Sequence, residues 1–167
     1  MTVVFLDLDG VLCTDKEFFM SQVKFQSKND WAKQLNVQYP FNPGCVDIFN
    51  YLSDLVDFKV VLSSDWKDHY NLDELNTIFS KNGVKVSPID VTHGYRVDLF
   101  STLEDNRHFQ IMSWVNKHKP DKWLVLDDLD MTKHFEASGL LDNFFLTKSS
   151  EGLKQTGLKN KILNKLK

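Results

Sequence analysis

The stretch Val3-Val4-Phe5-Leu6-Asp7-Leu8-Asp9-Gly10-Val11-Leu12 decides the fold of this chain. Residues 2–8 form a β-prone apolar run without alternation, which is typical of a strand buried on both faces of a parallel sheet. Two later runs repeat this pattern, at residues 58–64 and 122–128, and all three end in hydroxyl or carboxylate side chains. A shorter apolar run at residues 143–147 is a fourth expected strand.

Helical patterns separate these strands. They lie at residues 42–56, 72–83, 105–118, 131–138 and 156–166. Asn42 and Pro43 are the expected N-cap and first residue of the first helix. Residues 11–41 and 91–104 fit the alternation poorly, and the second of these segments reads as a loop. Strands that alternate with helices predict βαβ units, and therefore an α/β fold with a mostly parallel sheet.

The composition indicates one domain. The chain has 167 residues, and its twenty Lys and Arg against twenty-three Asp and Glu give a net charge of −3. We therefore expect a single domain over residues 1–167, and not a protein that coats nucleic acid by bulk charge. No apolar run approaches the roughly 20 residues of a membrane helix, so we expect a cytoplasmic protein without a membrane partner. Cys13 and Cys45 are expected to be reduced, packed thiols.

Acidic and hydroxyl side chains gather at the ends of three expected strands. These side chains are Asp7 and Asp9, Ser63 and Asp65, and Asp127 and Asp128. A lone Asp after a strand is usually a helix cap or a turn residue. Several carboxylates at neighbouring strand ends, however, repel one another and lose hydration unless a cation neutralises them. Because all the expected ligands are oxygen atoms, we predict Mg²⁺ and not zinc at this site.

Three of these strand ends resemble motifs of the haloacid dehalogenase superfamily. The segment Asp7-Leu8-Asp9-Gly10 is similar to its first motif, Val60-Val61-Leu62-Ser63 to its second, and Leu126-Asp127-Asp128 to its fourth, in the family's order. The resemblance implies a Rossmann-like three-layer sandwich with a mostly parallel central sheet and at most a minimal cap. It also implies phosphoryl transfer, since superfamily members that act on carbon–halogen bonds lack the second Asp of the first motif.

The resemblance assigns roles to the residues of these motifs. Asp7 would attack phosphorus and form an aspartyl-phosphate. Asp9 would protonate the leaving oxygen and then activate the hydrolytic water. Ser63 would donate a hydrogen bond to a phosphoryl oxygen. Asp127 and Asp128 would hold Mg²⁺ together with Asp7 and the backbone carbonyl of Asp9.

The superfamily's third motif is a cation, and the sequence offers three candidates. Arg107 lies twenty residues before Asp127, at the start of the expected helix, and is the first choice. Lys67 is the second choice, and the Lys119-Pro120 pair is a poor third because it lies at a helix end. For Arg107 and Lys67 the competing interpretation is a solvated surface charge. Within the superfamily, these segments resemble a small subgroup associated with RNA-repair and phage polynucleotide-end-processing proteins, in which an Arg stands where this chain has Lys67.

Other residues carry weaker predictions. We expect Asp65 to cap the following helix more readily than to act in catalysis. Trp31 and Trp66 could stack on a base, but a place in the core is the stronger expectation. The five His residues show no ligand spacing, although His93, like Arg96, lies in a loop that could touch the substrate. Residues 148–167 hold six Lys and one Glu, which predicts a solvated helix face that could guide a polyanion.

The length also bears on the substrate. Residues 14–41, between the first and second motifs, could form a small flap but not a full lid. An open site suits a large substrate, so we expect a phosphorylated partner that is either a small molecule or a nucleic-acid end. The alternative function is a catalytically weak binding module of a nucleic-acid repair or phage complex, because a fold does not fix its function.

Overall fold

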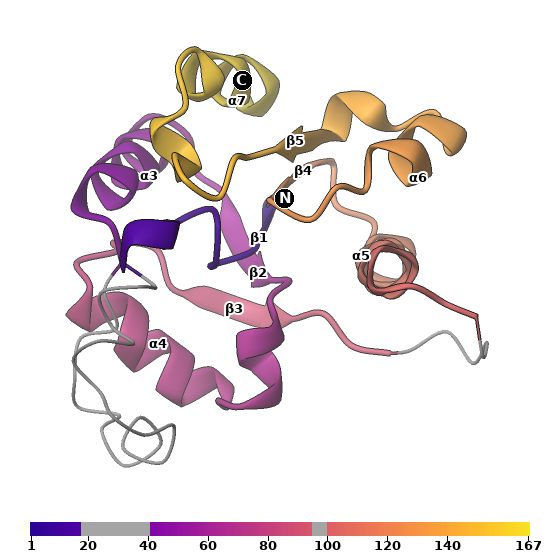
Figure 1. Ribbon diagram of the computed structural model, residues 1–167, viewed down its shortest axis with the longest axis horizontal. Coiled ribbons are helices and arrows are strands. Elements are labelled where there is room, and N and C mark those ends of the chain that lie inside the picture. The colour runs from indigo at the N-terminus through magenta and orange to yellow at the C-terminus, as the bar shows by residue number, and fades with distance from the viewer. Residues whose placement is uncertain (18–40, 95–99) are drawn as a thin grey trace.

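The computed structural model describes residues 1–17, 41–94 and 100–167, and its centre is a five-stranded sheet in the order β3-β2-β1-β4-β5. Every pair of neighbouring strands is parallel (Figure 1). The strands are β1 (Thr2–Leu6), β2 (Lys59–Leu62), β3 (Pro88–Val91), β4 (Lys122–Asp127) and β5 (Phe144–Leu146). The α-helices are α3 (Pro43–Leu55), α4 (Leu72–Lys81), α5 (Leu103–His118), α6 (Thr132–Ala137) and α7 (Leu158–Leu166). Short 3₁₀ turns are η1 (Asp65–Asp68), η2 (Leu141–Asn143) and η3 (Gly152–Lys154).

Helices cover both faces of this sheet and give three layers. Alternate side chains of β1, β2 and β4 pack on one side against α3, α4 and α7, in a core that includes Leu6, Phe49 and Phe79. The other side packs against α5 and α6, around Phe5 and Trp114. This is the α/β three-layer sandwich expected from the sequence.

The register of the central strands sets the level of the polar residues that follow them. Leu6 of β1 lies opposite Leu62 of β2 and Leu126 of β4. The ladder continues past the strands, because the amide of Ser63 donates to the carbonyl of Leu6 at 2.8 Å and the amide of Asp7 donates to that of Leu126 at 3.0 Å. Parallel strands in this register bring the three strand ends to one edge of the sheet.

The structure corrects the sequence-based elements at two places. β3 was not predicted, because its four residues begin with Pro88 and only Pro88 is buried. Pro is tolerated there since β3 is an edge strand and Pro88 is its first residue. α5 begins at Leu103 and not at residue 105, because Thr102 and Asp105 form a capping box. Residues 91–104, expected to form a loop, therefore contain the last residue of β3 and the first residues of α5.

The expected flap at residues 14–41 lies mostly outside the described residues, and so do Trp31 and Arg96. Its two flanks nevertheless meet. The amide of Asn42 donates to the carbonyl of Leu12 at 2.8 Å, and the Asn42 side chain donates to Glu17 Oε1 at 2.8 Å. The same Asn42 caps α3, whose first residue is Pro43, as predicted. The described residues on either side of the expected insertion are thus held together by hydrogen bonds.

The chain after β5 holds the loop that follows β1. The hydroxyl of Thr147 donates to the carbonyl of Gly10 at 2.7 Å, and the amide of Leu153 donates to that of Val11 at 3.1 Å. Gly152 has a φ of +56°, and a Cβ there would lie 2.5 Å from the carbonyl oxygen of Val11 and 2.9 Å from Cys45 Sγ. A glycine is therefore required for this close approach.

The cysteines and the helix lengths agree with the sequence-based expectations. Cys13 and Cys45 are free and buried, as expected. Among the described residues, no helix has the length and apolar character needed to cross a membrane.

The close approach at Gly152 can be tested with alanine. We expect Gly152→Ala to lower the free energy of unfolding by about 3 kcal/mol, because a left-handed φ and an overpacked contact both oppose the new methyl group. Gly139 is the matched control, since its φ is +70° but a Cβ there meets nothing within 4 Å. Gly139→Ala should cost only about 1 kcal/mol. Urea denaturation of both variants measures the difference, and equal losses would show that the contact with Val11 is unimportant.

Candidate active site

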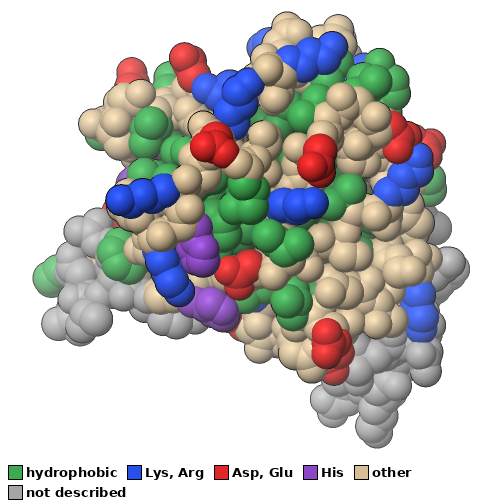
Figure 2. Space-filling model, turned by 180° about the vertical axis from the view of Figure 1, so that it is seen from behind, with side chains coloured by type: hydrophobic (Ala, Val, Ile, Leu, Met, Phe, Trp, Pro, Cys, Tyr) green, Lys and Arg blue, Asp and Glu red, His purple; other side chains and the backbone are tan. Residues whose placement is uncertain are grey.

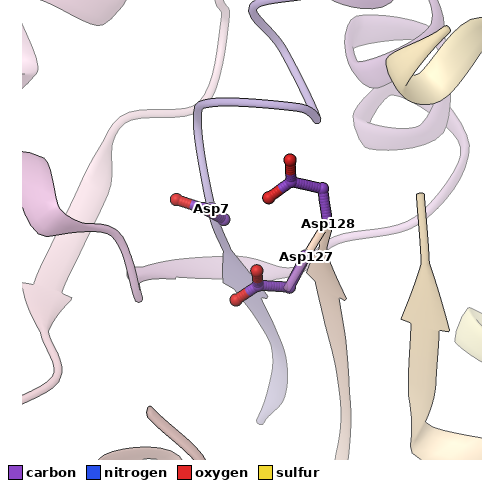
Figure 3. A group of neighbouring side chains, drawn as sticks. All are labelled: Asp7, Asp127 and Asp128. Carbon is purple, nitrogen blue, oxygen red and sulfur yellow. The ribbon is translucent and has the colours of Figure 1, made fainter. Parts of the chain in front are cut away.

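Three carboxylates converge where β1 and β4 end. One side-chain oxygen each of Asp7, Asp127 and Asp128 lies within 4.8 Å of the other two (Figure 3). Asp7 and Asp127 are buried, and Asp128 is half-buried. Gly10, with a φ of +71°, passes so close to Asp128 that a Cβ would overlap its carboxylate. The backbone of the turn after β1 therefore packs directly against the Asp128 side chain at the end of β4.

The electrostatics of this group favour a bound cation. Burial raises the pKa of Asp7 and, more strongly, that of Asp127. The nearby charge of Asp7 also raises the pKa of Asp127. Burial, Asp7 and Asp9 together raise the pKa of Asp128 to about 6. Three oxygen donors that resist ionisation, and that lie close enough to share one ion, fit a hard divalent cation such as Mg²⁺. Among the described residues, no His or Cys joins the group.

Arg107 is the protein's own counter-charge to these acids. It enters from the first turns of α5, with its side chain only 5% exposed. Nη1 lies 3.0 Å from Asp127 Oδ2 and 3.5 Å from Asp7 Oδ2, and Nη2 lies 2.7 Å from Asp65 Oδ1. Burial alone would lower the pKa of Arg107, but the three carboxylates outweigh it and raise that pKa. Arg107 thus stands where the third-motif cation is expected, whereas Lys119 caps the opposite end of α5.

The exposed Asp65 does not cap a helix through a side-chain bond, contrary to the sequence-based expectation. It is the first residue of η1, and no side-chain hydrogen bond caps that turn. Its carboxylate instead pairs with the guanidinium of Arg107. The sequence could not reveal this pair, because the two residues are 42 positions apart.

Two neighbouring hydroxyls follow β2, and they have different surroundings. The Ser63 hydroxyl is fully buried and lies 3.5 Å from that of Thr92, which in turn lies 3.3 Å from Gln110 Oε1. The Ser64 hydroxyl is also buried but makes no hydrogen bond within the described residues. It lies close enough to Asp7 to lower the pKa of that carboxyl. Ser64, to which the sequence gave no role, is thus the hydroxyl that lowers the pKa of Asp7.

Asp9 and Lys67 complete the site at its rim. Asp9 is exposed, and its Oδ2 accepts a hydrogen bond of 2.9 Å from Nε1 of Trp66. The indole is buried and contacts the rings of Phe41 and Tyr70, so Trp66 is a core residue, as expected, and not an exposed platform for a base. Lys67 is half-buried, with Nζ 3.3 Å from the carbonyl of Ser64. Burial and the nearby Arg107 lower the pKa of Lys67.

The structure therefore brings the predicted site residues to one edge of the sheet: Asp7, Asp9, Ser63, Lys67, Arg107, Asp127 and Asp128. A family model described as "HAD domain in Swiss Army Knife RNA repair proteins" matches residues 3–158. The chain belongs to this HAD family. No curated protein and no solved structure matches the chain significantly. The HAD domain is what the three motifs around Asp7, Ser63 and Asp127 predicted.

The dependence of the buried acids on Arg107 can be measured by mutation. We expect Arg107→Met to lower the free energy of unfolding by about 3 kcal/mol in the presence of EDTA, because it leaves buried carboxylates without a partner. In an Asp127→Asn background the same change should cost at least about 1 kcal/mol less, since one of these carboxylates is gone. Urea denaturation of the four proteins in this double-mutant cycle gives the coupling energy.

Asp54 provides the control for this cycle. It pairs with Lys85 on the surface, and its side chain is 54% exposed. The effects of Arg107→Met and Asp54→Asn should simply add. Additivity with Asp127→Asn as well would contradict the contribution assigned to Arg107.

Proposed function

We propose that this HAD domain is a Mg²⁺-dependent phosphomonoester hydrolase that works through an aspartyl-phosphate on Asp7. The observation that carries the proposal is the position of the Asp7 carboxylate. Its Oδ1 accepts a hydrogen bond of 2.8 Å from the amide of Leu8, and its Oδ2 faces Arg107. It also shares a potential metal site with Asp127 and Asp128. A carboxylate that is fixed and flanked by positive charge is suited to attack an anionic phosphoryl group.

The proposed reaction has two steps. In the first, a carboxylate oxygen of Asp7 forms a bond to phosphorus while the bond to the leaving oxygen breaks, and Asp9 gives its proton to that oxygen. In the second, Asp9 takes a proton from water and the water oxygen bonds to phosphorus while the bond between phosphorus and the Asp7 oxygen breaks, which gives inorganic phosphate and the free carboxylate of Asp7. Asp9 lies at the exposed rim, where a leaving group and a water molecule can both reach it.

The other residues of the site act on charge and orientation. Arg107 neutralises the phosphoryl oxygens beside Asp7, and Ser64 and Ser63 are the hydroxyl donors at the end of β2. Lys67, whose Nζ lies 3.3 Å from the carbonyl of Ser64, adds a second basic side chain toward the rim. Mg²⁺, held by Asp7, Asp127, Asp128 and the backbone carbonyl of Asp9, would screen the nucleophile from the charge of the phosphate.

For the substrate we propose the terminal phosphate of a nucleic acid. Support comes from the family, whose description names RNA repair proteins, and from the short insertion between the first two motifs. On the face shown in Figure 2, basic and acidic side chains are intermixed, in agreement with the net charge of −3. Such a surface does not bind polyanions in bulk, so recognition would centre on the end of the strand.

Replacement of the nucleophile is the direct test. Asp7→Asn keeps the size of the side chain but removes its charge, so we expect turnover of an aryl phosphate with Mg²⁺ to fall by on the order of 10³-fold or more. Initial rates at saturating Mg²⁺ measure the loss. Wild-type rates in Asp7→Asn would refute the aspartyl-phosphate mechanism.

Two controls accompany this test. Asp57→Asn alters an exposed acid that pairs with Lys59, before the start of β2, and should leave the rate unchanged. EDTA should abolish wild-type turnover, and Mg²⁺ should restore it. Absence of turnover in the wild-type protein with Mg²⁺ would instead favour the alternative of a binding module.

The substrate class can be tested separately. We expect a 3′-phosphorylated oligonucleotide to be hydrolysed with a kcat/KM at least about tenfold above that of a 3′-mononucleotide, because contacts beyond the terminal residue contribute binding free energy of the order of 1.4 kcal/mol. Phosphate release from the two substrates and from a sugar phosphate measures the ratio. Equal values would remove nucleic-acid ends from consideration and leave small phosphomonoesters.

A further inference from the structure

The side chain of Asp9 is held by one described contact. Asp9 is the exposed residue of the turn after β1, and an exposed aspartate can adopt several rotamers. Within the described part of the chain, the 2.9 Å bond from Nε1 of Trp66 to Oδ2 is the only hydrogen bond to its carboxylate. Within residues 1–17, 41–94 and 100–167, the carboxylate that transfers protons in the proposed reaction is thus oriented by a single hydrogen-bond donor.

The donor, Trp66, is fixed by packing and by backbone hydrogen bonds. Trp66 is 7% exposed, and its ring centroid lies 6.1 Å from that of Phe41 and 5.8 Å from that of Tyr70. Its backbone carbonyl accepts from the amides of His69 and Tyr70, both at 3.0 Å, which closes the turn η1. A side chain fixed by packing on a hydrogen-bonded turn can in turn fix the group it touches.

The chemistry of the donor adds a second constraint. An indole N–H donates one hydrogen bond and has no site that accepts one. The oxygen that faces it, Oδ2, must therefore remain an acceptor whether Asp9 is protonated or ionised. In a protonated carboxyl group the carbonyl oxygen accepts a hydrogen bond better than the hydroxyl oxygen does, so the indole N–H favours the proton on Oδ1.

We propose that Trp66 is a positioning residue that keeps Oδ1 of Asp9 as the proton-carrying oxygen in both steps of the reaction. This inference rests on the proposed function, because it concerns the proton transfers assigned to Asp9. In the first step Oδ1–H gives its proton to the leaving oxygen. In the second step Oδ1 accepts a proton from water, and Trp66 donates to Oδ2 throughout.

The leaving group distinguishes this role from a structural one. A nitrophenolate leaves without a proton, whereas an alkoxide requires one, so a misplaced acid slows the first step only for the second kind of substrate. Hydrolysis of the aspartyl-phosphate follows with either substrate, so the release of the leaving group in a single turnover is the quantity to compare. We expect Trp66→Phe to lower the single-turnover rate of leaving-group release from an alkyl phosphate by about 10- to 100-fold, and that from 4-nitrophenyl phosphate by less than about threefold. Asp9→Asn should show the same selectivity to a greater extent.

Trp114→Phe is the matched control. Trp114 is also 7% exposed, and its Nε1 donates to an aspartate, Asp90 Oδ2, at 2.7 Å, but this pair lies between α5 and β3 and outside the site. Its loss should leave the ratio of the two rates of leaving-group release unchanged. An equal slowing of leaving-group release from both substrates in Trp66→Phe, or the same ratio as in Trp114→Phe, would overturn the positioning role.

A spectroscopic measurement tests the contact without any turnover. In protein labelled with ¹⁵N at its four tryptophans, the indole N–H signal that disappears in Trp66→Phe is that of Trp66. In Asp9→Ala this signal should move upfield, while that of Trp114 stays in place. An unmoved Trp66 signal would overturn the inference even if the phosphatase proposal holds. A wild-type protein inactive on both phosphates, with the signal shifted, would instead refute the proposed function and, with it, the role of Trp66 in proton transfer.

Discussion

Buried negative charge at the ends of β1 and β4 is the constraint on which the rest of this HAD domain depends. Asp7 and Asp127 are held inside the protein by the register of the parallel strands, and isolated carboxylates in such a place would be protonated. Arg107 offsets part of the effect of burial on their pKa values, and it reaches them because the first turns of α5 lie at the same edge of the sheet. The position of α5, the strand order and the Arg107 side chain together determine how these buried carboxylates are neutralised.

Residues around these carboxylates also support the site. Asp65 shares the guanidinium of Arg107, so the cation is balanced on its outer side as well. Gly10 allows the turn after β1 to pass against Asp128, and Gly152 lets the chain after β5 support that turn from behind. Trp66 then holds Asp9 at the rim. A buried nucleophile and an exposed acid are thereby supported by separate parts of the fold, which is what the two-step reaction proposed for Asp7 and Asp9 requires.

Much of this could be predicted from the sequence, because parallel buried strands leave a strong local signal. The runs ending at Asp7, Ser63 and Asp127 predicted the central strands, the sheet class and the edge at which the acids meet. β3 gave no such signal, since an edge strand of four residues with one buried side chain has no apolar run to detect. The choice of Arg107 over Lys119 was also available from the sequence, through the position of each along one helix.

The sequence alone determined which chemical groups this HAD domain carries and which of them follow buried strands, because strand periodicity and the order of motifs are local properties of the chain. Only the tertiary structure decided how those groups pair. It directed Asp65 to Arg107 and not to a helix end, placed Ser64 beside Asp7, and gave Asp9 its donor in Trp66. These partners are set by the turns after β1 and β2, whose directions depend on packing between segments distant in the sequence, and no local pattern encodes them.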